Sequence, residues 1–235
     1  MRHSPYKDMR ASFVVTAVVL AASMHASGQI SSSPVDPWTL VGNEHGIAIY
    51  RHDVPGSNIV ALKGEGPIDA PVWKVASVLL DTQRAPEWVD SLAESRVVRR
   101  LSDTSYVEYN HLRLPFPIRD REFVSDVRID VDHDDRSVTL RYQPAGAPDV
   151  PRSGNVRGQI RSGAFRARSL GAGRGTDLIA EIDCDPQGAI PAWLVNLFQQ
   201  RWPRNTFEGI RRQVAKPDIA MPEAFRAILM SAADF

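Results

Sequence analysis

The strongest constraint on the fold is a loop bracketed by prolines that runs directly into an alternating strand. Pro115 and Pro117 flank Phe116, and proline lacks a backbone donor and has a fixed φ, so this stretch cannot lie inside a sheet. We expect residues 114–118 to form an outward loop with apolar side chains at its tip. Residues 122–132 then alternate between apolar and polar side chains, which predicts a strand with one buried and one solvent-facing side.

Other segments carry equally local signals. A brief helix is predicted at 36–42, a helix at 71–80 with Asp69 as its N-cap, a long helix at 190–215 bent near Pro203, and a short helix at 222–230. The predicted strands lie near residues 46–52, 59–66, 95–101, 105–112, 121–131, 137–143, 156–168 and 176–185. Many antiparallel strands followed by one long helix favour an α+β fold, with the helix on the concave face of a curved sheet.

Length and composition are those of one globular domain. The 235 residues are 43% apolar and 24% charged with a net charge of zero, so no excess of positive charge attracts nucleic acid. Three basic residues, a short apolar stretch and then small residues open the chain, a pattern typical of a secretory signal. We therefore expect residues 1–28 to be a signal peptide, 29–35 a linker, 36–216 the folded domain and 217–235 a tail. The predicted location is periplasmic or extracellular, and an uncleaved anchor is the alternative.

The chain offers little of the chemistry that metals or cofactors need. Its six histidines lack metal-ligand spacing, and no G-x-S-x-G motif is present. The glycines of residues 171–175 precede a strand-like run, so they predict a hairpin turn rather than a phosphate-binding loop, which needs a helix. The single cysteine, Cys184, falls on the apolar side of a predicted strand and is expected to be a small buried residue. We expect no metal and no cofactor.

Four short segments, taken in order along the chain, form a recognisable pattern. They are residues 38–51 from WTL to GIAIYR, Glu87-Trp88, residues 117–124 (PIRDREFV), and residues 188–206 beginning GAIPAWLVN. In this order they resemble the START (StAR-related lipid-transfer) domain family, with Glu122 where the family usually has aspartate. The resemblance spans about residues 34–216. It implies a helix-grip fold, in which a curved antiparallel sheet wraps around its last helix and leaves space for a hydrophobic ligand.

The resemblance also suggests where the ligand would bind. Arg121 occupies the position of the family's signature arginine, in a family with a polar spot in an otherwise apolar tunnel. Its partner, Glu108 or Asn110, is left open, and the alternative is that these charges lie at the rim and only fix the loop. The candidate ligand-binding residues are Trp88, Glu108, Asn110, Leu114, Phe116, Arg121, Trp193, Leu194, Leu197 and Phe198.

We therefore interpret this chain as a non-catalytic protein that binds and transfers a lipid or another hydrophobic small molecule. The ligand would lie in an internal apolar cavity gated by the loop 114–118 and the C-terminal helix. That helix interleaves aromatic and basic residues, which suggests a transient contact with a membrane surface. We expect a monomer that binds no nucleic acid. The alternatives are an enzyme of the START-like superfamily, such as a polyketide cyclase or aromatase, and an interaction module that buries its apolar loop in a protein partner.

Overall fold

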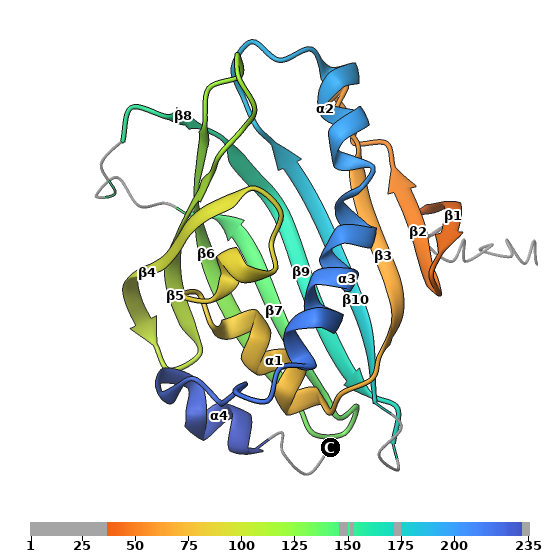
Figure 1. The fold of residues 1–235 in the computed structure, drawn as a ribbon, viewed down its shortest axis with the longest axis vertical. Coiled ribbons are helices and arrows are strands. Elements are labelled where there is room, and N and C mark those ends of the chain that lie inside the picture. Colours follow the sequence, from red (N-terminus) through yellow and green to blue (C-terminus); the bar gives the residue numbers. More distant parts are fainter. Residues whose placement is uncertain (1–36, 146–149, 151–152, 172–174, 232–235) are drawn as a thin grey trace, which may run out of the picture. The chain divides into compact units, whose positions relative to one another are not determined.

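An antiparallel sheet organises the fold. The computed structural model describes residues 37–145, 150, 153–171 and 175–231. Within these residues the sheet has ten strands in the order β1-β2-β3-β10-β9-β7-β6-β5-β4, with β8 parallel to the start of β6 (Figure 1). The strands are β1 (Thr39–Glu44), β2 (Ile47–His52), β3 (Ala61–Ile68), β4 (Leu92–Ser102), β5 (Ser105–Leu112), β6 (Arg121–Asp132), β7 (Ser137–Pro144), β8 (Val156–Arg157), β9 (Gln159–Ser169) and β10 (Thr176–Asp185).

The helices pack against one face of this sheet. They are α1 (Val72–Leu80), α2 (Ala192–Gln199), α3 (Trp202–Val214) and α4 (Arg226–Ser231), with 3₁₀ turns at Ala85–Glu87 and Glu223–Phe225. Helix α3 packs on β3 and β2, while α1 packs on β9 and β7 and contacts both α3 and α4 (Figure 1). The α+β helix-grip architecture expected from the sequence is confirmed.

The strand after the proline loop has the predicted two-sided character. Along β6 one row faces the core and is buried, namely Phe123, Ser125, Val127 and Ile129. The opposite row becomes exposed toward the end of the strand, at Arg128, Asp130 and Asp132. Burial of alternate residues therefore sets the register of β6 between β5 and β7, because a slip by one residue would expose the whole apolar row.

The predicted short helix over residues 36–42 is wrong, because the chain forms strand β1 there. Strand β1 pairs antiparallel with β2. The two residues between these strands, His45 and Gly46, have φ values of 53° and 75°, and a two-residue hairpin turn of this kind needs left-handed backbone at both positions. The cross-strand hydrogen bonds that follow outweigh a weak local helix signal. The predicted Asp69 cap is also wrong, because Pro71 occupies the N-cap position of α1 without a side-chain hydrogen bond.

Glycines allow the helices to approach the sheet closely. A Cβ atom placed on Gly64 of β3 would lie 2.9 Å from Cε2 of Phe207 in α3. On the other side of α3, a Cβ on Gly209 would lie 2.3 Å from the carbonyl oxygen of Trp88. Helix α3 is therefore held between β3 and the turn that carries Trp88.

A glycine also divides one predicted strand into two. The run expected over residues 156–168 is split into β8 and β9 at Gly158. A Cβ at this position would lie 2.4 Å from Cε1 of Phe123, so only glycine fits where the chain turns from one pairing to the next. Strands β9 and β10 pair antiparallel from Ser169 and Thr176 onward, as the predicted hairpin requires, and residues 172–174 of its turn lie outside the described residues.

The long C-terminal helix is interrupted where proline predicts a bend. Helix α2 ends at Gln199 and α3 begins at Trp202, with Pro203 in the first turn of α3. Proline lacks the N–H that would continue the helix from α2, so the break falls just before it. The predicted helix in the tail is also present as α4, and the tail adds Phe225 and Leu229 to the hydrophobic core.

The predicted signal peptide 1–28 and linker 29–35 lie outside the described residues. Among the helices that the structure describes, none is long and apolar enough to cross a membrane.

Candidate functional site

The concave face of the sheet, beneath the helices, is closed at one end and accessible at the other. Toward α1 and α4, apolar residues of β7, β9 and β10 are completely buried, namely Leu140, Ala167 and Leu178. Residues on the same face of these strands, two or more positions nearer to α2, are only half-buried, namely Tyr142, Phe165 and Ile182. The interior therefore retains accessible surface toward the end where α2 lies.

Aromatic rings mark the boundary between the two ends. Phe165 contacts Tyr142 in an edge-on arrangement with ring centroids 6.0 Å apart, and it contacts Trp202, the first residue of α3, at 6.2 Å. All three rings are half-buried and pack against the core. They form an apolar wall for the accessible part of the interior.

A polar cluster lies on the same face, on β4, β5 and β6. Oε1 of Glu108 accepts hydrogen bonds from Ser95 Oγ at 2.9 Å and Asn110 Nδ2 at 3.2 Å. Within the described part of the chain, Oε2 of Glu108 is buried without a hydrogen-bond partner, as are the hydroxyls of Ser125 and Tyr106. Ser125 lies directly opposite Glu108 across the β5–β6 ladder. Three buried polar atoms are thus left for a further partner, since buried polar groups are normally paired.

Burial raises the pKa of the acidic groups in and next to this cluster and so favours their neutral forms. Desolvation raises the pKa of Glu108 above its ordinary value, although the bonds from Ser95 and Asn110 act in the opposite direction. Burial, together with the nearby Glu108, also raises the pKa of Tyr106 and of Tyr142. The cluster therefore offers hydroxyl and carboxyl groups that can hydrogen-bond a polar group on an otherwise apolar ligand.

Arg121 is not part of this cluster, and neither Glu108 nor Asn110 is its partner. The Arg121 side chain is 3% exposed, and its guanidinium donates to three backbone carbonyls, those of Pro186 at 3.2 Å, Gln187 at 3.1 Å and Arg119. Burial lowers its pKa. The signature arginine thus joins the start of β6 to the connection between β10 and α2.

Replacement of Arg121 by lysine should therefore affect folding more than ligand selection. Lysine keeps the charge but lacks the planar fork that reaches several carbonyls at once. We expect a loss of about 1 kcal/mol in the free energy of unfolding, the typical net value of a hydrogen bond, measured by urea denaturation. The Arg113→Lys variant, at an exposed position on the same loop, serves as the control. Equal stability of the two variants would contradict this role.

The loop between β5 and β6 presents an apolar tip, as predicted. Phe116 is 97% exposed and Leu114 is half-buried. The base of the loop is closed by Asp120, which accepts hydrogen bonds from the Leu114 N–H at 3.0 Å and lies 2.9 Å from Nε2 of His111. These two contacts lower the pKa of Asp120. A fixed base therefore holds Phe116 away from the core.

Helix α2 also turns apolar side chains outward. The sequence pattern placed its apolar residues on one face with those of α3, but Trp193 is 67% exposed, Phe198 55% and Leu197 52%. Leu194 is half-buried, and Val195 is the residue of α2 that is buried. The first half of the predicted long helix is thus packed much less closely on the sheet than α3 is.

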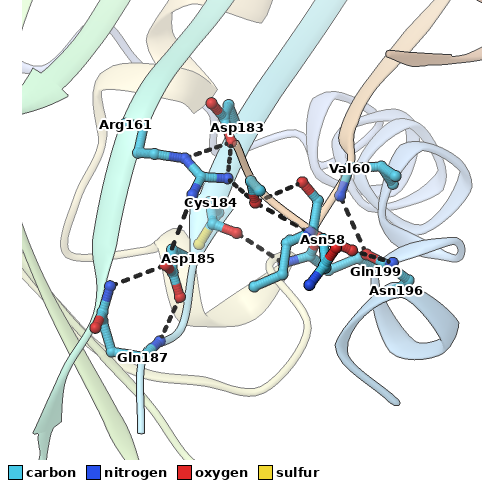
Figure 2. A network of polar contacts seen from close by, with 11 residues as sticks. Asn58, Val60, Arg161, Asp183, Cys184, Asp185, Gln187, Asn196 and Gln199 are labelled. Atoms are coloured by element: carbon cyan, nitrogen blue, oxygen red, sulfur yellow. Dashed lines mark hydrogen bonds and ion pairs between the residues drawn. The ribbon is translucent and has the colours of Figure 1, made fainter. Parts of the chain in front are cut away.

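Polar side chains attach α2 to the sheet (Figure 2). Asn196 donates to the carbonyl of Asn58 at 2.9 Å and accepts from the N–H of Val60 at 3.2 Å. Gln199 donates to the carbonyl of Cys184 at 3.2 Å. Cys184 is half-buried, and desolvation raises the pKa of its thiol to about 12, so the thiol stays protonated and unreactive near neutral pH.

An arginine organises the strand ends beneath α2. Arg161 of β9 pairs with Asp183 at 2.6 Å, lies 3.6 Å from Asp185, and donates to Ser57 Oγ at 3.3 Å (Figure 2). The β10 strand has an irregular register between Asp183 and Cys184. This network holds the β2–β3 loop and β10 in the positions that receive Asn196 and Gln199.

The remaining candidate lies apart from the others. Trp88 is 7% exposed in the hydrophobic core, next to Gly209 of α3. It therefore anchors α3 rather than lining the accessible end.

Four residues of the site were not predicted from the sequence, namely Ser95, Tyr106, Ser125 and Tyr142. Ser125 carried a signal, because it is a polar residue within the otherwise apolar row of β6, but its partners depend on strand register. Among the described residues, no group of three or more His, Cys, Asp or Glu side chains is arranged to hold a metal ion.

Comparison with known proteins agrees with this geometry. The model of the START domain family matches residues 33–215. An uncharacterized protein of Pseudomonas aeruginosa is 26% identical over 86% of this chain and 98% of its own length. The mouse phosphatidylcholine transfer protein is 28% identical, over 68% of this chain and 75% of its own length. The structure of a STAR-related lipid transfer protein from Xanthomonas axonopodis superposes with a TM-score of 0.68 at 25% identity, over 77% of this chain and all of that chain. With its family match spanning most of the chain and its helix-grip fold, this protein belongs to the START domain family.

Proposed function

We propose that this protein binds a lipid on its concave face and transfers it between membranes, without catalysis. The observation that carries the proposal is the accessible interior at the α2 end, bordered by the outward apolar residues of α2 and by Phe116. The names of relatives, which include lipid transfer proteins, support a lipid as the ligand. The polar cluster around Glu108 would bind the polar part of that ligand.

The energetics favour a carrier with a movable entrance. A lipid chain of about sixteen methylenes costs about 13 kcal/mol in water, at about 0.8 kcal/mol for each methylene. An apolar interior removes this cost. Helix α2 is held largely by hydrogen bonds from Asn196 and Gln199, and such bonds contribute about 1 kcal/mol each. We assign the entrance to α2 and the loop 114–118, because displacing α2 would break few contacts.

The same residues suit a transient contact with a bilayer. The side chains of Phe116, Trp193 and Phe198 are exposed, and exposed aromatic residues insert readily at the interface between water and lipid. Exposed arginines lie close in the sequence to these aromatic residues, namely Arg113, Arg119 and Arg201. Cations near a membrane surface are attracted to anionic lipid. Docking would bring the entrance against the membrane.

Replacement of Phe116 by aspartate tests this docking. A charge at the tip of the loop would oppose insertion, so we expect lipid transfer between vesicles to slow about fivefold, the effect of roughly 1 kcal/mol of lost insertion. The melting temperature should stay the same because the side chain contacts solvent. The Phe116→Leu variant should transfer at nearly the normal rate. Unchanged transfer by Phe116→Asp would exclude this loop from the entrance.

Native mass spectrometry of the protein purified from the organism that encodes it would identify the ligand. A co-purified lipid would support the carrier. A bound cyclic product would support the enzyme alternative, which Glu108 favours because a buried carboxyl with a raised pKa suits proton transfer. A stable complex with another protein would favour an interaction module.

We also propose that the protein acts outside the cytoplasm, in the periplasm or the medium. The support is the basic, apolar and small-residue order of the first 28 residues. Cell fractionation of the full chain should recover a shortened protein outside the cytoplasm. Recovery of the full-length chain in the cytoplasm would overturn this assignment.

A further inference from the structure

A second region of the molecule has the chemistry of a binding site, separate from the concave interior. A cavity of about 590 Å³ opens where β7 and β8 part along the same side of β6. Ala145, just after β7, donates its N–H to the Val124 carbonyl, and Val156 of β8 pairs with the start of β6. This volume lies within the usual range for sites of small molecules.

All of the described polar side chains that line this cavity carry N–H donors. They come from the loop after β5, from the β8–β9 segment and from the connection to α2, and they are Arg119, Asn155, Arg157, Gln159 and Gln187. Among the described residues that line it, none is an aspartate or a glutamate, although the Gln187 amide already donates one hydrogen bond to Oδ2 of Asp185 at 2.9 Å. By contrast, a second cavity, of about 320 Å³, mixes Arg141 with Glu181 and Asp183. Donors without carboxylates favour an anionic occupant.

The charges of the described residues around the cavity do not cancel. Arg157 is neutralised by the fully buried Glu122, whose Oε1 lies 2.8 Å from Nε of Arg157. Arg119 donates to the carbonyl of Gly154, and within the described part of the chain neither Arg119 nor Arg121 forms an ion pair with a carboxylate. The two guanidiniums are close enough for Arg119 to oppose the charge on Arg121, although nearby Asp120 favours it. An anion in the cavity would offset this excess positive charge.

We propose that the cavity binds a phosphate group, with Arg119 as the charged contact and the amides of Asn155, Gln159 and Gln187 as further donors. A guanidinium binds phosphate oxygens with two parallel hydrogen bonds, and side-chain amides complete such a shell as neutral donors. The volume leaves room for the organic part of a phosphate ester. The phosphate could come from the head group of a lipid at the surface or from a free phosphate compound, and both sources share the same recognition chemistry.

Nuclear magnetic resonance of the labelled full chain tests the proposal directly. Titration with glycerol 3-phosphate or inorganic phosphate should shift the side-chain amide signals of Asn155, Gln159 and Gln187, whereas glycerol should not. The Arg119→Gln variant should weaken this binding about tenfold, as expected for loss of a hydrogen bond between charged groups. The Arg113→Gln variant is the matched control, because it removes the same charge from the same loop outside the cavity.

Vesicles distinguish the two sources of phosphate. Binding to phosphatidylcholine vesicles containing one fifth phosphatidylglycerol, weakened clearly more by Arg119→Gln than by Arg113→Gln, would assign the site to lipid head groups. Binding of soluble phosphates alone would assign it to a free compound. Amide signals that do not move with any phosphate, or equal losses in the two variants, would overturn the site. Because the amide signals report only on these side chains, the phosphate titration does not depend on lipid in the interior.

Discussion

Replacing Trp193, Leu197 and Phe198 together by serine should slow lipid transfer between vesicles by at least about tenfold. Each of these α2 side chains is more than half exposed, and burial of such a side chain in an apolar phase contributes about 1.5–3 kcal/mol. Losing even part of that contribution at the membrane exceeds the roughly 1.4 kcal/mol that corresponds to tenfold. The measurement is the rate of transfer of a fluorescent lipid from donor to acceptor vesicles.

The control for this variant is an apolar pair at another exposed site. Leu40 and Val41 of β1 are 59% and 56% exposed, so the Leu40→Ser/Val41→Ser protein also loses exposed apolar surface. We expect it to transfer lipid at the normal rate. Similar losses in the two variants would mean that transfer responds to general surface hydrophobicity and not to α2.

Replacing Glu108 by glutamine should stabilise the protein at neutral and higher pH. Glu108 is 6% exposed, and burial raises its pKa above the ordinary value of 4.5. The stability contributed by the protonated group is fully present below about pH 4.5 and is lost as the pH rises through the higher folded-state pKa. Glutamine keeps an acceptor for Ser95 and Asn110 and cannot ionise.

We expect the free energy of unfolding of Glu108→Gln to exceed that of the natural protein by about 1–3 kcal/mol at about pH 8, the usual cost of an unsatisfied buried polar group. The difference should vanish at about pH 4. Urea denaturation at several pH values measures it, and Glu44→Gln, at an exposed position, is the control. A Glu108→Gln protein that is less stable at about pH 8 would show that the ionised carboxylate has a stabilising partner.

Much of the fold could be predicted because its signals are local. The alternation of β6 and the break before Pro203 each depend on neighbouring residues alone. Strand β1 could not be predicted in the same way, because its hydrogen bonds come from β2 and only appear once the turn at His45 and Gly46 forms. Without that pairing, no signal in the sequence competes with the weak helix-start signal at residues 36–42.

The sequence predicted several residues of the candidate site, but it did not predict which partners those residues contact. Helical periodicity grouped Trp193, Leu197 and Phe198 correctly on α2, but it cannot tell whether an apolar face meets the sheet or the solvent. Arg121 and Glu108 were natural partners by charge. In the folded chain each has found other partners, backbone carbonyls for Arg121 and the side chains of Ser95 and Asn110 for Glu108.

Most of the strands and helices, the outward loop at Phe116 and the family of this protein follow from the sequence by itself, since each depends on short-range patterns. Only the tertiary structure decided which side of α2 faces water, which atoms of Glu108 remain unpaired and which arginines share a cavity near β8. These properties arise where segments distant in the chain meet, and their energies depend on the burial and spacing that the packed sheet and helices impose.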